Sequence, residues 1–185
     1  ASRGLGDVYK RQKQWNAILE CHLTAPFKIL RAAQPHIKRL FLEEKEQGIT
    51  NFRKVVNISS TSGMNGNAGQ INYATAKAGV VGMAKTMAKE WGRYNVNVNA
   101  VGFGLIKTRL TDADAEKEES LIDIEGNKIK VGVNSAVFQS AKTMIPLGRP
   151  GTPQEAAGAI YMFCIPESNY VTGQILMCHG GGFGL

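Results

Sequence analysis

The fold is decided by residues 54–103, which read KVVNISSTSGMNGNAGQINYATAKAGVVGMAKTMAKEWGRYNVNVNAVGF. Residues 54–60 are short, β-branched and flanked by polar residues, which predicts a buried strand. Residues 61–70 are rich in Gly, Asn and Ser and predict a loop. Residues 72–94 predict a long helix, and residues 95–103 predict a second short strand. This order predicts an α/β fold.

The same alternation of helix and strand extends outward on both sides. Residues 14–43 have a helical apolar period, and Pro26 and Pro35 predict kinks or a break in it. Residues 121–133 predict a hairpin whose two-residue loop is Gly126–Asn127, within an irregular stretch at 107–145. Beyond it, residues 152–164 predict a helix and residues 171–177 a last strand. Strands separated by helices pair in parallel, through right-handed crossovers.

The last predicted helix has a clear start. Thr152 is expected to cap it, Pro153 stands in its first turn, and Glu155 completes a capping box.

Composition predicts one soluble globular domain. The chain has 185 residues, of which 43% are hydrophobic and 20% are charged. No apolar run approaches the roughly 18 residues of a membrane helix, and the first residues do not form a secretory signal. The three cysteines are Cys21, Cys164 and Cys178. They are widely spaced, which argues against zinc or disulfide frameworks, and we expect no metal site and a reducing, cytoplasmic location.

The net charge of +7 invites a nucleic-acid interpretation. The charged residues of the first thirteen are Arg3, Asp7, Lys10, Arg11 and Lys13. These four cations and one anion give +3, which leaves +4 for the other 172 residues. No basic stripe interleaved with aromatic residues appears, so we expect no nucleic-acid partner.

Tyr73 and Lys77 form the first candidate for chemistry. They stand four apart at the start of the predicted helix and so share one face. A phenol is a poor acid–base catalyst at neutral pH, and an ammonium nearby favours its ionised form. A phenol tuned in this way can donate a proton to a carbonyl oxygen or take one from an alcohol. The spacing alone is weak, because such a pair occurs readily by chance.

Ser60 is the second candidate. It ends the strand at 54–60, and parallel sheets present their ligand sites at the carboxyl ends of strands. Its hydroxyl could hydrogen-bond a substrate carbonyl. The alternative is a serine that only caps the loop, and Ser59 and Ser62 are equally plausible caps.

Taken together, these elements form one continuous pattern that closely resembles the short-chain dehydrogenase/reductase family. The resemblance runs from about residue 14 to residue 182, and residues 145–176, IPLGRPGTPQEAAGAIYMFCIPESNYVTGQIL, match the family's last helix and strand. Within the family the sequence is most similar to bacterial enzymes that reduce 3-oxoacyl thioesters on acyl carrier protein. The resemblance implies a Rossmann-like, doubly wound parallel sheet and hydride transfer with a nicotinamide cofactor.

The resemblance also assigns roles to residues. It implies that Tyr73 is the general acid–base, that Lys77 holds the nicotinamide ribose, and that Ser60 steadies the substrate oxygen. It implies that Ile106 contacts the nicotinamide carboxamide through its backbone and that Thr108 lies near the cofactor phosphates. The family favours NADP, with NAD not excluded.

Two substitutions depart from the family pattern. His22 stands where the family has a catalytic Asn, so we expect His22 either to relay a proton in its place or to be a half-buried helix histidine. Phe103 replaces the proline of a Pro-Gly pair, while Gly104 keeps the turn on the cofactor side possible.

The glycine-rich nucleotide loop and the first strands of the family are missing. RGLGD at residues 3–7 is no substitute, because no strand precedes it. We therefore interpret residues 13–185 as the C-terminal part of one reductase domain, inactive by itself and with an unpaired sheet edge, and residues 1–12 as non-native or disordered.

The sequence thus predicts an NAD(P)H-dependent reductase of 3-oxoacyl thioesters, with acyl carrier protein as a possible partner and a homotetramer or homodimer as the assembly. Alternatives are a sugar, steroid or hydroxyacyl-CoA dehydrogenase of the same family, or a non-catalytic oligomerisation module.

Overall fold

The computed structural model describes residues 12–108, 121–124, 127–130 and 143–182. The chain divides into two compact units. The first comprises residues 1–102 with 159–177, and the second comprises residues 103–158 with 178–185. The segment at 1–11, most of the stretch predicted to be non-native or disordered, lies outside the described residues.

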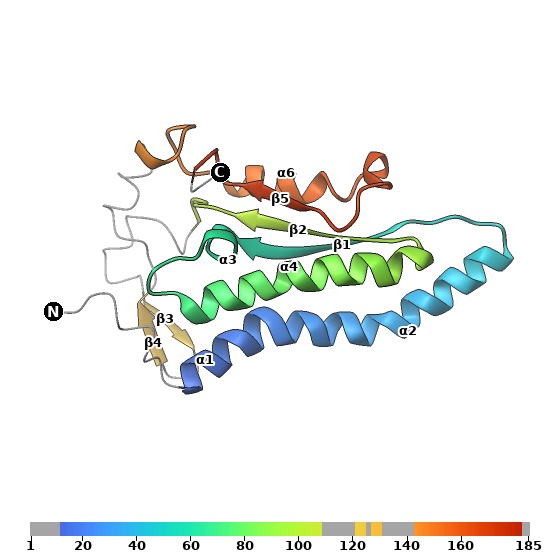
Figure 1. The fold of residues 1–185 in the computed structure, drawn as a ribbon, viewed down its shortest axis with the longest axis horizontal. Helices are drawn as coiled ribbons and strands as arrows, with labels where there is room; N and C mark the ends of the chain where they lie inside the picture. The colour runs from blue at the N-terminus through green and yellow to red at the C-terminus, as the bar shows by residue number, and fades with distance from the viewer. Residues whose placement is uncertain (1–11, 109–120, 125–126, 131–142, 183–185) are drawn as a thin grey trace. The chain divides into compact units, whose positions relative to one another are not determined.

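A three-stranded sheet organises the fold, with strand order β1-β2-β5. The strands are β1 (Arg53–Ser60), β2 (Val96–Phe103) and β5 (Ile175–Cys178). Their arrows run in the same direction (Figure 1), which confirms the predicted parallel α/β sheet. Among the described strands, β1 has only β2 as a neighbour, so its other edge carries no strand of this part of the chain.

β5 begins later than the predicted strand at 171–177. The preceding residues reach β2 through backbone bonds in part, since Gly173 N donates to Val98 O over 2.8 Å and Ala100 N donates to Gln174 O over 2.9 Å. The side chain of Asn99 interrupts this ladder: its Nδ2 donates to Val171 O over 2.9 Å, and its Oδ1 accepts from the N–H of Gln174 over 2.9 Å. Asn99 is almost fully buried, so these bonds satisfy its amide and the regular strand begins only at Ile175.

Helix α4 (Ile71–Trp91) packs against β1 on one face of the sheet, and α2 (Ala25–Glu46) runs beside it (Figure 1). Small and branched residues at helical spacing form the buried face of α4, including Ala76, Val80 and Ala84. Of these, Ala84 belongs with Val96 and Val98 of β2 to the main apolar core. This buried face explains why a helix with two internal glycines is stable.

The predicted helix at 14–43 is two helices. α1 (Gln12–Leu19) is joined to α2 by a π-helical turn, η1 (Glu20–Thr24). Pro26 lies in the first turn of α2, where its missing N–H costs little. Pro35 lies inside α2 without ending it, so the predicted break at this residue is wrong. α2 continues to Glu46, beyond the predicted end.

Two short helices flank α4. Residues Thr61–Asn65 form α3 where a loop was predicted, and η2 (Gly92–Tyr94) is a 3-10 turn before β2. α3 forms because Ser60 caps it, as described below.

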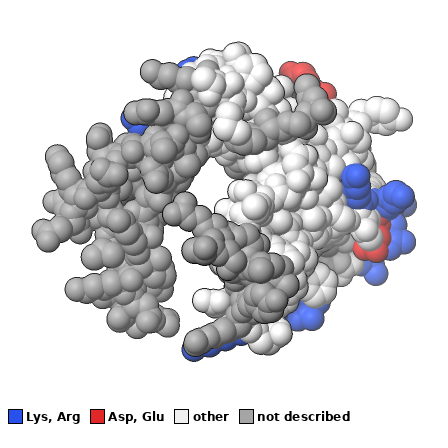
Figure 2. Space-filling model, turned by 60° about the vertical axis from the view of Figure 1, so that its left-hand side comes forward, with Lys and Arg blue, Asp and Glu red and all other residues white. Residues whose placement is uncertain are grey.

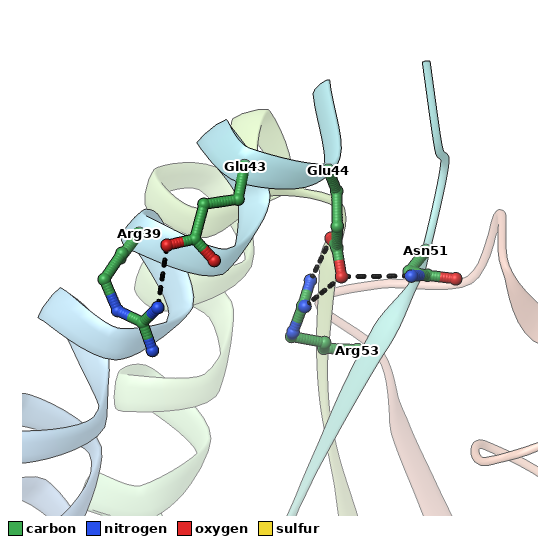
Figure 3. Close-up of polar contacts among 5 residues, drawn as sticks. All are labelled: Arg39, Glu43, Glu44, Asn51 and Arg53. Carbon is green, nitrogen blue, oxygen red and sulfur yellow. Dashed lines mark hydrogen bonds and ion pairs between the residues drawn. The ribbon is translucent and has the colours of Figure 1, made fainter. Parts of the chain in front are cut away.

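Polar contacts fasten the end of α2 to the start of β1 (Figure 3). The Arg53 guanidinium donates to both oxygens of Glu44 over 2.6 and 2.9 Å, and Asn51 Nδ2 also donates to Glu44 over 3.0 Å. These hydrogen bonds lower the pKa of Glu44 and raise that of Arg53. Such a bidentate ion pair fixes the relative orientation of the two side chains and also pairs their charges.

Charged side chains of opposite sign also pair elsewhere on the surface. Arg39 binds Glu43 over 2.8 Å, and Lys28 binds Glu20. At the right-hand edge of Figure 2, blue side chains stand beside red ones. Part of the positive charge is therefore neutralised locally.

In the second unit, β3 (Leu121–Ile124) and β4 (Asn127–Lys130) form the predicted antiparallel hairpin. Ile124 pairs with Asn127, so the two-residue connection is 125–126 and the predicted Gly126–Asn127 loop is wrong by one residue. The predicted register and the observed register both place Ile129 opposite an isoleucine and Asp123 opposite a lysine. The side-chain pattern of this segment therefore does not distinguish the two registers.

Helix α6 (Pro153–Tyr161) begins with the predicted capping box. The N–H of Glu155 donates to Thr152 Oγ1 over 3.2 Å, and the N–H of Thr152 donates to Glu155 Oε2 over 2.8 Å. Arg149 adds two further bonds to the same carboxylate, over 2.6 and 2.8 Å.

These bonds lower the pKa of Glu155 to about 2, with the Arg149 hydrogen bonds as the largest cause. Because the folded-state pKa is depressed, the contribution to stability is present above about pH 4.5 and is lost as the pH falls toward 2. We expect a side-chain NMR titration to place the Glu155 midpoint near pH 2. In an Arg149→Gln variant the midpoint should rise toward the ordinary value, and an unchanged midpoint would contradict this cause.

Across the described residues, no helix combines the length and apolar character needed to cross a bilayer.

Candidate active site

Tyr73 and Lys77 lie on the first turns of α4, as predicted. Asn72, which is 3% exposed, fixes this end of the helix. Its Oδ1 accepts from the N–H of Tyr73 over 2.9 Å, and its Nδ2 donates to Gln14 O over 3.3 Å. The backbone of Tyr73 is thereby tied to helix α1.

Lys77 is 8% exposed and is held against β1 at both ends. Its Nζ donates to Ile58 O over 2.9 Å, and its backbone carbonyl accepts from Ser59 Oγ over 2.8 Å. Burial lowers the pKa of Lys77, because the charged form loses hydration. Nζ lies 5.6 Å from the centroid of the Tyr73 ring. The two residues therefore meet in space as well as in sequence.

Ser60 ends β1 and is the N-cap of α3. Its Oγ accepts from the N–H of Ser62 over 3.2 Å. Of the three serines weighed from the sequence, Ser60 is thus the cap, while Ser59 anchors Lys77 and Ser62 donates to Gln70. A hydroxyl that accepts one bond keeps its own proton to donate, so capping does not prevent Ser60 from binding a substrate oxygen.

α3 approaches α4 closely at Gly63. A Cβ at this position would lie 2.7 Å from the carbonyl carbon of Lys77 and 2.8 Å from the nitrogen of Ala78. Both atoms belong to backbone and have little freedom to move. Gly63 therefore lets the loop after Ser60 close over the turn that carries Lys77.

A Gly63→Ala variant should lose about 1–3 kcal/mol of stability, the usual cost of overpacking. In a chain of this size, we expect the melting temperature to fall by several degrees. Gly158→Ala in α6 is the matched control, because a Cβ at position 158 meets no atom within 4 Å and alanine favours the helix. Equal melting of Gly63→Ala and the unaltered protein would refute the close approach.

His22 lies on the π-helical turn η1 and faces Tyr73. The two ring centroids are 5.2 Å apart and the rings are nearly perpendicular, at 88°. Burial and the charge of Lys77 both lower the pKa of His22, burial being the larger cause. The imidazole is therefore neutral at pH 7.

A pocket of about 320 Å³ lies beside these residues. His22, Lys77 and Cys21 line it together with residues 55–58 of β1. Asn57 contributes a buried side chain whose Nδ2 has no hydrogen-bond partner among the described residues. The pocket thus follows the strand edge of β1 that no described strand covers.

The other predicted residues belong to the second unit. Ile106 forms a parallel bridge with Gly151, where Lys107 N donates to Gly151 O over 2.8 Å and Gly151 N donates to Leu105 O over 3.0 Å. Gly104 N donates to Cys178 O over 3.0 Å. Thr108 is half-buried. Their expected contacts with a cofactor stay predictions.

The three cysteines are free thiols. Among the described residues, no three His, Cys, Asp or Glu side chains gather as a metal site.

The sequence reasoning missed three supporting residues, namely Ser59, Gly63 and Asn72. Asn72 and Ser59 each stand directly before a predicted site residue. This placement indicated that they could help to position it. Gly63 carried no signal, because only the distance between α3 and α4 shows why a side chain is excluded.

Comparison with known sequences extends over nearly the whole chain. A model of a short-chain dehydrogenase family, described as enoyl-(acyl carrier protein) reductase, matches residues 6–182. The 3-oxoacyl-[acyl-carrier-protein] reductases FabG of Thermotoga maritima and Aquifex aeolicus are 35% and 33% identical to it. These alignments cover 94% and 91% of this chain but 59% and 56% of those proteins, so the chain spans a little over half of their length.

Solved structures agree with these relatives. A short chain dehydrogenase from Bacillus anthracis, 29% identical, matches with a TM-score of 0.64 over 92% of this chain and 56% of that chain. A 4-hydroxyisoleucine dehydrogenase complexed with NADH, 22% identical, matches with a TM-score of 0.68 over 94% of this chain and 61% of that chain, a likeness of fold alone. The chain therefore belongs to the short-chain dehydrogenase/reductase family.

Proposed function

We propose that this protein is an NAD(P)H-dependent oxidoreductase that reduces the 3-oxo group of an acyl thioester. The observation that carries the proposal is the grouping of Tyr73, Lys77 and His22 on α4 and η1, in a chain of this family. The names of the FabG relatives support the substrate class.

Two side chains of this site suit the hydroxyl groups of a nicotinamide ribose. Lys77 Nζ makes one hydrogen bond among the described residues, to Ile58 O, and an ammonium has three donors. The ribose would be held by Lys77 and Tyr73. Contacts with the nicotinamide and the phosphates would come from Ile106, Thr108 and Gly104. A bound NADPH or NADH would supply the hydride.

Tyr73 carries out the proton transfer. Its hydroxyl donates a proton to the oxo group as the carbonyl carbon gains hydride, and the product is a 3-hydroxyacyl thioester. Ser60 donates a hydrogen bond to the same oxygen, and the Lys77 charge favours the phenolate that remains.

The chain spans a little over half of the length of the FabG relatives, so the assay uses it joined to an N-terminal nucleotide-binding part. Cofactor oxidation is measured with a 3-oxoacyl thioester, a 2-enoyl thioester, a keto sugar and a ketosteroid, each with NADPH and with NADH. We expect the 3-oxoacyl thioester with NADPH to give the highest kcat/KM. A preference for the enoyl thioester would instead follow the description of the matching family model, and a preference for the sugar or steroid would favour another dehydrogenase of the family. Absence of turnover with every pair would leave a non-catalytic oligomerisation module.

We also propose a homo-oligomer formed through α2 and α4, with acyl carrier protein as the carrier of the substrate. The small-residue stripe of Ala74, Ala78 and Gly82 supports the assembly, since Ala78 and Gly82 are exposed rather than packed on the sheet. Exposed Lys107 supports an acidic partner. Sedimentation would test the homo-oligomer. The salt dependence of turnover with carrier-bound substrate would test the acidic partner.

A further inference from the structure

His22 contacts the candidate acid directly. Its ring lies perpendicular to the ring of Tyr73 with centroids 5.2 Å apart, within the range of favourable aromatic pairs. Lys77 Nζ is the second group at the same phenol, 5.6 Å from the ring centroid. The orientation of Tyr73 is thus set by its helix position and by these two side chains.

His22 reaches Tyr73 because it lies in the π-helical turn. In η1, Glu20 points to solvent and pairs with Lys28, while Cys21 and His22 line the pocket with Lys77. Among the described residues, the titratable groups that contact His22 or line the pocket with it are Tyr73 and Lys77 from α4 and Cys21 from its own turn. The charge of Lys77 makes a second positive charge here unfavourable, so the imidazole packs as a neutral ring.

We infer that His22 is a positioning residue, which holds the phenol of Tyr73 beside Lys77 through the contact of the two rings. This inference rests on the proposed function. It differs from a proton relay, because a ring contact needs the shape of the imidazole and not its nitrogen atoms.

Two substitutions separate the ring from its polarity. His22→Phe keeps an aromatic ring and removes the hydrogen-bonding atoms, whereas His22→Gln keeps a polar side chain and removes the ring without introducing the asparagine that the family has at this position. We expect His22→Phe to retain kcat within about twofold and His22→Gln to lose about tenfold, with KM for thioester and NADPH unchanged.

A second readout distinguishes positioning from a loss of folded protein. A displaced phenol slows proton transfer in every folded molecule, so a single turnover of NADPH oxidation becomes slower while its amplitude stays the same. We expect the slower single turnover in His22→Gln and not in His22→Phe, while simple destabilisation lowers the amplitude without changing the rate constant.

The opposite order would overturn the inference. Should His22→Gln work normally while His22→Phe is impaired, the hydrogen-bonding atoms matter and His22 is a relay. Normal kcat and a normal single-turnover rate in both variants would show that His22 has no role in turnover. Either result leaves the proposed function standing as long as Tyr73→Phe is inactive, whereas an active Tyr73→Phe would remove the proposed acid itself.

Discussion

Replacing Tyr73 with phenylalanine should lower kcat by about 10²–10⁴-fold, the usual contribution of a general acid. The substitution removes one oxygen atom and keeps the ring that contacts His22 and Lys77. Folding should therefore change little. Cofactor binding should weaken far less than kcat falls, because Lys77 still holds the ribose. Stopped-flow or steady-state oxidation of NADPH with a 3-oxoacyl thioester measures it.

Tyr94→Phe is the matched control for this substitution. Tyr94 lies in η2 and stacks edge-on against Phe41, with ring centroids 5.7 Å apart. It has no contact with Lys77 among those described, so its variant should keep full activity. A Tyr73→Phe protein with kcat within a few fold of the unaltered protein would exclude Tyr73 as the acid.

Replacing Lys77 with methionine should have the second largest effect. An ammonium beside a phenol stabilises the negative charge that proton transfer leaves on the phenol oxygen, and Lys77 is also a proposed donor to the nicotinamide ribose. Loss of both contributions should lower kcat/KM by about 10–10³-fold at neutral pH, with part of the loss in the KM for the cofactor.

The control for Lys77→Met is Lys85→Met, two turns further along α4 and exposed. That variant should keep both kcat and the KM for the cofactor. Lys77→Met also removes the donor to Ile58 O, so its melting temperature should be measured with its kinetics. A loss of activity that only follows the loss of folded protein at the assay temperature would assign Lys77 to packing instead of to the chemistry of the site.

The central elements could be predicted because their patterns are local. The strand predicted at 54–60 is found at Arg53–Ser60, and the helix predicted at 72–94 is α4 followed by the η2 turn. β-Branched residues between polar ones and small residues at helical spacing specify these elements by themselves. The capping box at Thr152 and Glu155 is equally local.

Elements that depend on tertiary contacts could not be predicted in the same way. The shorter β5 follows from the bonds of Asn99, and α3 follows from the cap that Ser60 provides. The grouping of Ser60, Tyr73 and Lys77 was expected from family resemblance, since spacing alone did not join Ser60 to the pair. The contact of His22 with Tyr73 depends on the π-helical turn η1, which no residue in the segment predicts.

The π-helical turn makes the number of residues before α2 as important as their identity. A π-helical turn holds one residue more than an α-helical turn, so Glu20–Thr24 behaves as a stored single-residue insertion. Deleting one residue within the turn would remove this insertion and leave α1 in nearly its present phase relative to α2. Deleting one residue of α1 after Gln14 would instead rotate the start of α1 by roughly 100° about the helix axis. That rotation would carry Gln14 away from Asn72 and remove the contact that fixes the start of α4. A deletion in this part of α1 is therefore expected to be far less tolerated than a deletion in the turn.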